Sequence, residues 1–152
     1  QGSHFQAGEL TFLLPLQMEK LDPSLMQETT LSAIGLITKV NEILASLDLK
    51  DGLLAFKAIN AKKEAVYPIF ETYCRNLAIT ILNLQTIFDM ETFVLGGGIS
   101  AQSILIEEVN RQFDKVHHEI DFIGKIIKRP KIVACHHNGT NLIGAAYFLK
   151  QG

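Results

Sequence analysis

Two short β-rich runs on either side of a helix constrain the fold of this chain more than any other feature. The first run is Thr92 to Leu95, and the second is Lys131 to Cys135. Between them, Ser100 is an expected N-cap, and apolar residues recur at helical spacing as far as about His118. A strand, a helix and a second strand in this order predict two parallel strands joined by a right-handed crossover.

Helical spacing also predicts helices before and after this unit. Apolar residues recur at steps of three and four from Thr29 to Leu47, and a short helix is expected around Leu53 to Ala58. A long helix is expected from about Lys63 to Phe88, and because it is apolar nearly all round we expect it to be buried on several sides. A closing helix is expected over about 141–150, whereas residues 1–25 read as irregular.

The length of the chain and the small number of strands bear on its domain organisation. The 152 residues are enough for one hydrophobic core, and we expect residues 1–152 to form a single domain. Two strands are too few for a stable parallel sheet, whose strands are normally covered on both faces. Either the N-terminal segment adds strands or the rest of the sheet lies on further chain. Because the first residue is Gln1 and not methionine, we favour further chain.

Composition and charge exclude several classes of protein. The formal net charge of −2 argues against a nucleic-acid partner, because such domains usually carry a basic excess. A hydrophobic content of 47% excludes a disordered chain, and two cysteines are too few for a disulfide framework. The most apolar stretch, Leu77 to Phe88, is well short of the roughly 20 residues that a bilayer span needs. We therefore expect a cytoplasmic protein with no membrane partner.

Three glycines, Gly96, Gly97 and Gly98, follow the first strand and are the best physical indication of a binding site. Glycines between a strand and a helix let a ligand approach the backbone, where free N–H groups and the positive end of the helix favour an anion. The spacing matches neither the dinucleotide fingerprint nor a Walker loop. Nucleotide binding and a simple tight turn are therefore both open interpretations.

The histidines, the cysteines and a basic run have plainer interpretations. Neighbouring helix residues diverge by about 100°, so His117 and His118 cannot readily share one metal ion. The sequence has no recognised metal-binding spacing, and we interpret this pair and the later pair at 136–137 as surface histidines. Cys74 and Cys135 are interpreted as buried thiols, and the basic residues over 125–131 as a solvated loop.

Four stretches together resemble the ROK family, which groups bacterial sugar kinases with sugar-responsive repressors. Residues 2–10 look like the family's glycine-rich AGE loop, and residues 28–32 look like the E-[TA]-x-x-S segment that opens the next helix. Residues 83–100 resemble its "NL…FDP…IVLGGGVS" block, with Met90 where proline is usual. Residues 138–146 resemble its "GN-x-AGLIGAA" motif. The four motifs occur in the right order and spacing along nearly the whole chain.

The resemblance implies an α/β fold of the ribonuclease H-like (actin-like ATPase) type. This chain would be the C-terminal domain portion, helix-rich with a short parallel sheet. The family's phosphate-binding D-x-G-G-T loop and its sugar-binding N-D motif, whose aspartate is the general base, lie upstream. The resemblance therefore implies a half-molecule without a catalytic residue, inactive alone, in a full-length protein that uses ATP with Mg²⁺.

Individual positions take their expected roles from the same resemblance. Glu9 and Glu28 match the two glutamates that bind sugar hydroxyls, and the glycines at 96–98 match those beside the adenosine. Members with a structural zinc carry histidine three residues after the loop glutamate and then a cysteine cluster. Phe12 stands at that histidine position and residues 13–27 contain no cysteine, so no structural zinc is expected.

The function implied by the resemblance is that of the sugar- and nucleotide-binding C-terminal domain of an ATP-dependent kinase of hexose-type sugars. The alternative is the sugar-sensing domain of a repressor, a binding module without catalysis. A third interpretation is a helix-rich oligomerisation domain whose glycines only make turns. The sequence does not name the sugar, because half of the pocket would lie elsewhere. Uncovered apolar helix faces and an open sheet edge further predict that the chain self-associates or binds its other half, and we expect a homo-oligomer.

Overall fold

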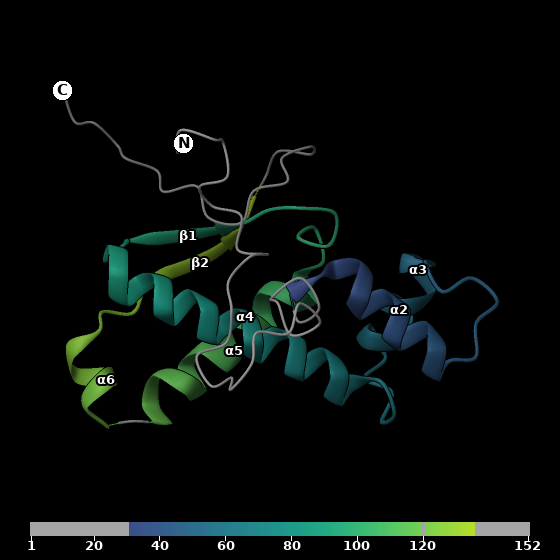
Figure 1. Ribbon diagram of the computed structural model, residues 1–152, viewed down its shortest axis with the longest axis horizontal. Helices are drawn as coiled ribbons and strands as arrows, with labels where there is room; N and C mark the ends of the chain where they lie inside the picture. Colours follow the sequence, from purple (N-terminus) through teal and green to yellow (C-terminus); the bar gives the residue numbers. More distant parts are fainter. Residues whose placement is uncertain (1–30, 120, 136–152) are drawn as a thin grey trace, which may run out of the picture. The chain divides into compact units, whose positions relative to one another are not determined.

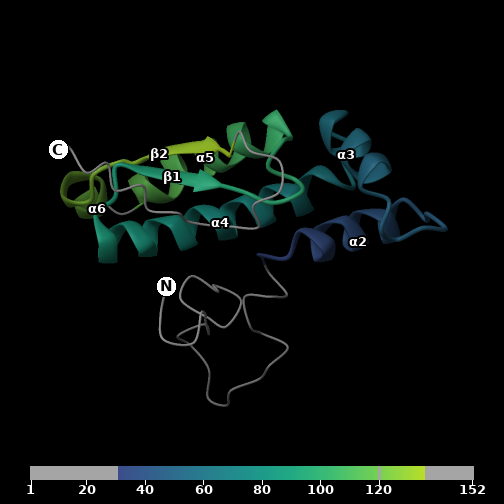
Figure 2. The same ribbon diagram turned by 90° about the horizontal axis from the view of Figure 1, so that it is seen from above.

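The computed structural model describes residues 31–119 and 121–135 of the chain (Figures 1 and 2). The chain divides into two compact units between Asn76 and Leu77, a point within helix α4 (Tyr67–Phe88). The first unit contains α2 (Ala33–Ile43), α3 (Gly52–Asn60) and the start of α4. The second unit contains the rest of α4, β1 (Thr92–Leu95), α5 (Ser103–Glu119), α6 (Asp121–Ile126) and β2 (Lys131–Ala134). The expectation of a single domain stays a prediction.

Helix α2 is shorter than the sequence pattern predicts. Its N-cap is Ser32, whose Oγ accepts a hydrogen bond from the Gly35 N–H at 3.1 Å. The helix expected over 29–47 is therefore found as Ala33–Ile43. It ends there because the backbone soon turns left-handed, with φ of 51° at Ala45.

The loop between α2 and α3 is closed by one buried amide. The Asn41 side chain donates hydrogen bonds to the carbonyls of Leu49, at 3.2 Å, and Asp51, at 2.9 Å. The Asp51 carboxylate in turn accepts a bond from the Leu54 N–H at 2.9 Å, which caps α3. The helix expected around 53–58 is confirmed and is slightly longer at both ends.

The core of the first unit is built on an aromatic pair. Phe56 of α3 and Phe70 of α4 meet edge to face, with ring centroids 6.4 Å apart, an arrangement that aromatic rings prefer. Further buried apolar residues of the same unit are Val40, Ala55, Ile59, Val66 and Cys74. The prediction that Cys74 is a buried thiol is confirmed.

Helix α4 begins later than expected. The Lys63 carbonyl accepts hydrogen bonds from the N–H groups of Val66 and Tyr67, at 2.9 and 2.8 Å, so residues 63–66 form a turn and not a helical start. The helix starts at Tyr67 and continues to Phe88. Pro68 is its second residue, where a missing N–H removes no helical hydrogen bond.

Burial along α4 is one-sided. Leu77 and Ile81 are buried, but Ile79, Ile87 and Phe88 are exposed, the last two by more than half. The expectation that the helix is buried on several sides is therefore wrong for the side that carries Ile79, Ile87 and Phe88. An apolar helix pattern does not by itself say how many neighbours cover it.

The two strands of the second unit form the predicted parallel sheet. Thr92 lies opposite Lys131 and Leu95 lies opposite Ala134 in a sheet of two strands among the described residues. Alternate residues of β1, Phe93 and Leu95, are buried. Figure 1 shows α4 and α5 on the same side of the strands. The strand, helix and strand order predicted from the sequence is confirmed.

Two amide side chains tie the helices of the second unit to its strands. Gln85, buried on α4, accepts a hydrogen bond from the Met90 N–H at 2.9 Å and donates one to the Lys128 carbonyl at 3.1 Å. Asn110 of α5 donates to the Ile132 carbonyl of β2 at 3.1 Å. These bonds set where β1 and β2 begin relative to the helices.

Several expectations fall outside these elements. Helix α6 occupies part of a stretch that we interpreted as a loop. The irregular segment 1–25 and the closing helix expected over 141–150 lie outside the described residues. In the part of the chain that the structure describes, every helix is too short or too polar to cross a bilayer.

Candidate functional site

The glycines that follow β1 form a turn with an uncovered backbone. Gly97 has φ of +99°, a conformation that residues with side chains rarely adopt, and Gly98 is exposed. A Cβ atom placed at either glycine would have no described heavy atom within 4 Å. The turn therefore leaves space in which a ligand could approach the main chain.

Ser100 closes this turn and does not cap α5. Its Oγ donates a hydrogen bond to the Gly97 carbonyl at 2.8 Å, and its N–H donates to the same oxygen at 3.1 Å. A second turn follows, in which the Gln102 N–H donates to the Ile99 carbonyl at 3.1 Å, and α5 begins at Ser103. The prediction that Ser100 is the N-cap of α5 is therefore wrong, because its hydroxyl is hydrogen-bonded within the glycine turn and the helix begins three residues later.

The sheet holds the start of this turn in place. The Leu95 side chain is buried, and its carbonyl accepts a hydrogen bond from the Cys135 N–H at 2.8 Å. The turn follows the carboxyl end of β1, and in parallel α/β sheets ligands bind outside the carboxyl ends of the strands. Backbone N–H groups at such a position suit a phosphate or a sugar oxygen. Gly96, the first glycine, is half-buried and links the strand to the open part of the turn.

The two glutamates expected to bind sugar lie outside the described residues. Glu9 and Glu28 precede Leu31, where the described part of the chain begins. Their expected role stays a prediction. Of the described residues of the resembling segment 28–32, Ser32 caps α2, and the Leu31 carbonyl accepts a hydrogen bond from the Tyr73 hydroxyl.

One of the two described histidines was misjudged. His117 is only 5% exposed, with its ring stacked on Phe113 at 5.6 Å and Nε2 2.6 Å from the Ile127 carbonyl oxygen. The surface interpretation is wrong for His117 and confirmed for His118. The missed signal is spacing, because His117 follows Phe113 by four residues and lies on the same inner face of α5. Histidines 136–137 lie outside the described residues.

The side chains of the basic run are exposed to solvent, as predicted: Lys125, Lys128, Arg129 and Lys131. The Arg129 Nε also donates a hydrogen bond to the Asp114 carboxylate at 2.6 Å. Cys135 is half-buried, so its interpretation as a buried thiol is wrong. No group of three or more metal-ligating side chains occurs within 31–119 and 121–135, and the zinc expectation stays untested.

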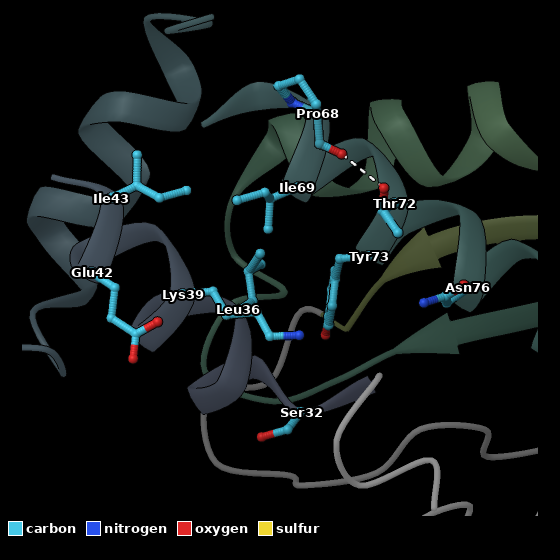
Figure 3. A pocket seen from close by; sticks show the side chains of 10 residues that line it. All are labelled: Ser32, Leu36, Lys39, Glu42, Ile43, Pro68, Ile69, Thr72, Tyr73 and Asn76. Atoms are coloured by element: carbon cyan, nitrogen blue, oxygen red, sulfur yellow. Dashed lines mark hydrogen bonds between the residues drawn. The ribbon is translucent and has the colours of Figure 1, made fainter. Parts of the chain in front are cut away.

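The first unit contains a cavity that the sequence did not indicate (Figure 3). Its volume is about 560 Å³, and it lies between α2 and the first turns of α4. The lining is mixed: Leu36, Ile43, Pro68, Ile69 and Tyr73 are apolar or aromatic, and Ser32, Lys39, Glu42, Thr72 and Asn76 are polar. Helical spacing places these residues on facing sides, but only the packing of the two helices leaves a space between them.

Tyr73 is the most perturbed titratable group of this cavity. Burial, with a smaller contribution from Cys74, raises the pKa of the Tyr73 phenol well above its ordinary value. Its hydroxyl donates a hydrogen bond to the Leu31 carbonyl at 3.2 Å. The phenol is therefore neutral at physiological pH and is a fixed wall of the cavity, not a reacting group.

Comparisons with known proteins identify a family and a similar solved structure. The family model described as the ROK family matches residues 27–152. The crystal structure of a ROK family protein from Streptococcus pneumoniae TIGR4, in complex with sucrose, matches with a TM-score of 0.74 and 26% identity. The match covers 90% of this chain and 45% of that one, so the chain spans less than half of its relative's length. No curated protein matches the chain.

Proposed function

Because this chain belongs to the ROK family, we propose that it is the C-terminal sugar- and nucleotide-binding domain of an ATP-dependent sugar kinase. The family also contains repressors, so the kinase role is the specific part of the proposal. The observation that supports it is the turn at Gly97 and Gly98, where an added Cβ would meet no described heavy atom and a ligand could reach the backbone. The sugar-bound neighbour supports the choice of a sugar as the second ligand.

In this proposal the chain binds and positions its ligands without supplying the base. The N–H groups of the glycine turn would contact the nucleoside part of ATP, and Glu9 and Glu28 would accept hydrogen bonds from sugar hydroxyls. Holding the sugar and ATP in reactive positions would contribute much of the rate enhancement of phosphoryl transfer. Mg²⁺ would neutralise phosphate charge, held by the phosphates and by residues beyond this chain. The ribonuclease H-like fold and a cytoplasmic location belong to the same proposal.

The nucleotide role can be tested at Gly98. Its backbone is not in the left-handed region and a Cβ there meets no described atom, so Gly98→Leu should fold normally while its side chain occupies the ligand's space. Titration of a non-hydrolysable ATP analogue into the full-length protein should show at least about a tenfold loss of affinity, as expected when a ligand is displaced from a backbone site. Lys57→Leu, at an exposed position of α3, is the matched control. Unchanged affinity in Gly98→Leu would remove the turn from the nucleotide site.

Turnover separates the kinase from the repressor. The full-length protein should transfer the γ-phosphoryl group of ATP to one of a panel of glucose, mannose, N-acetylated hexosamines and glucosides, whereas the 152-residue chain alone should show none. Binding of a sugar with no phosphoryl transfer to any of them would favour the repressor.

We also propose that the protein is a homo-oligomer. Large apolar side chains are exposed on both units, among them Leu47, Leu53, Ile87 and Ile126. Exposed apolar groups of this size are typical of contact surfaces. Sedimentation of the full-length protein should show a species larger than a monomer, and a monomer across a wide concentration range would contradict this.

A further inference from the structure

The cavity of the first unit has the size and lining of a small-molecule site. Its volume of about 560 Å³ lies within the range of roughly 300–1,000 Å³ that is typical of ligand pockets. Its lining includes both a buried residue, Leu36, at 2% exposure, and an exposed one, Ile43, at 45%, so the cavity extends from the core of the unit to its surface. Every lining residue comes from the first unit alone.

Most polar atoms of the lining are already used within the chain. Ser32 Oγ accepts a hydrogen bond from the Gly35 N–H, and Thr72 Oγ1 donates to the Pro68 carbonyl at 2.9 Å (Figure 3). The Tyr73 hydroxyl is bound to the Leu31 carbonyl. Because these groups are hydrogen-bonded within the chain, they form the walls of the cavity and do not determine which ligand it binds.

Two charged side chains of the lining form no hydrogen bond or ion pair with another described residue. They are Lys39 and Glu42, both exposed on α2. Figure 3 shows the Lys39 side chain turned toward the interior of the cavity and the Glu42 carboxylate turned away from it. Of the two charged side chains in the lining, the one turned toward the interior is therefore the positive one.

We propose that this cavity binds an organic anion with a flat ring, such as an aromatic carboxylate. The ring would lie against Leu36, Ile69 and Tyr73, where an aromatic wall and aliphatic side chains favour flat apolar groups. The carboxylate would pair with the Lys39 ammonium. The site is additional to the proposed sugar and ATP sites, because it uses neither the glutamates nor the glycine turn.

Three indole compounds of nearly equal size test the sign of the charge. They are indole-3-acetate, an anion, tryptophol, which is neutral, and tryptamine, a cation. Calorimetric titration into the full-length protein should place indole-3-acetate tightest and tryptamine weakest. No binding at millimolar concentration, or tryptamine binding tightest, would overturn the proposal.

Substitutions locate the site and its charge. Lys39→Met should weaken indole-3-acetate by about two- to tenfold, the range for a partly exposed ion pair, and leave tryptophol unchanged. Lys57→Met, which removes an exposed lysine outside the lining, should change neither. Ile69→Phe should fill the cavity and weaken all three compounds. Equal affinities in Lys39→Met and wild type would overturn the proposal, even if Ile69→Phe failed to fold.

One further variant separates this site from the proposed nucleotide turn. Gly98→Leu should bind indole-3-acetate as tightly as wild type does, whatever its effect on ATP. Loss of indole-3-acetate binding in Gly98→Leu would mean that the two ligands share one site, and the proposal of an additional site would be wrong.

Discussion

The glycine turn of the second unit and the cavity of the first unit are two openings made in different ways. The turn is open because Gly97 and Gly98 carry no side chains, so the residue types alone indicate the opening. The cavity is open because α2 and α4 leave a space between side chains of ordinary size. An opening of the first kind can be anticipated from a sequence, whereas one of the second kind depends on how two helices pack.

The same contrast extends to the polar groups at each opening. At the turn, the Ser100 hydroxyl and N–H both bind the Gly97 carbonyl, so the structure there is maintained by local bonds over three residues. At the cavity, Tyr73 binds Leu31 across 42 positions of the chain. A substitution at the turn should therefore change the structure only of neighbouring residues. A substitution at the cavity should also affect the packing of segments that are distant in the sequence.

The largest expected effect tests whether the two units have separate cores. Phe70 and Phe113 are fully buried, one in each unit, and truncating either to alanine should cost about 3–5 kcal/mol of stability. Amide hydrogen exchange should show Phe70→Ala losing protection in α2 and α3, and Phe113→Ala losing it in α5 and β2. Equal loss in both units for both variants would contradict the division.

The next largest effect concerns the two glutamates that are expected to bind sugar. If Glu9 and Glu28 accept hydrogen bonds from sugar hydroxyls, Glu9→Ala or Glu28→Ala should weaken sugar binding roughly ten- to a hundredfold, since charge-assisted bonds contribute about 1.5–3 kcal/mol. Affinity for an ATP analogue should change little. Calorimetry on the full-length protein measures both, and two solvated surface acids would affect neither ligand.

The two adjacent glycines should respond differently to the same change. Gly97→Ala places a side chain at φ of +99° and should cost on the order of 1–2 kcal/mol. Gly98→Ala has no such strain and no close neighbour among the described residues, so it should leave stability nearly unchanged. Denaturant unfolding of the two variants compares them directly. Equal losses of stability in the two variants would contradict the assignment of the strain to the positive φ of Gly97.

The smallest effect tests the wall of the cavity. Tyr73→Phe removes the hydrogen bond to Leu31 and should cost about 0.5–1.5 kcal/mol at neutral pH. The pKa of Tyr73 is raised above 10.0, so the folded protein holds this proton more tightly than the unfolded chain does. Its contribution to stability is complete below about pH 10 and falls as the pH rises further. Unfolding of Tyr73→Phe should be less sensitive to alkaline pH, and identical alkaline profiles would contradict the assignment.

The elements of the described chain were largely predictable, and their ends were less so. The helix at Gly52–Asn60 and the parallel strands at 92–95 and 131–134 follow from hydrophobic period and turn residues, which are local properties. The end of α2 and the start of α4 were misjudged, since Ala45 and Lys63 enter turns that hydrophobic period does not reveal. Boundaries depend on hydrogen bonds that compete with the helix.

By itself, the sequence determined the family, the strand, helix and strand order, and the position of the glycine turn. Each of these rests on residue types at short spacing, where neighbours along the chain interact directly. Only the tertiary structure decided that Ile87 is exposed and that a cavity forms beside Tyr73. Burial and empty space depend on which distant segments pack together, and a helical pattern constrains the face of a helix without naming what covers it.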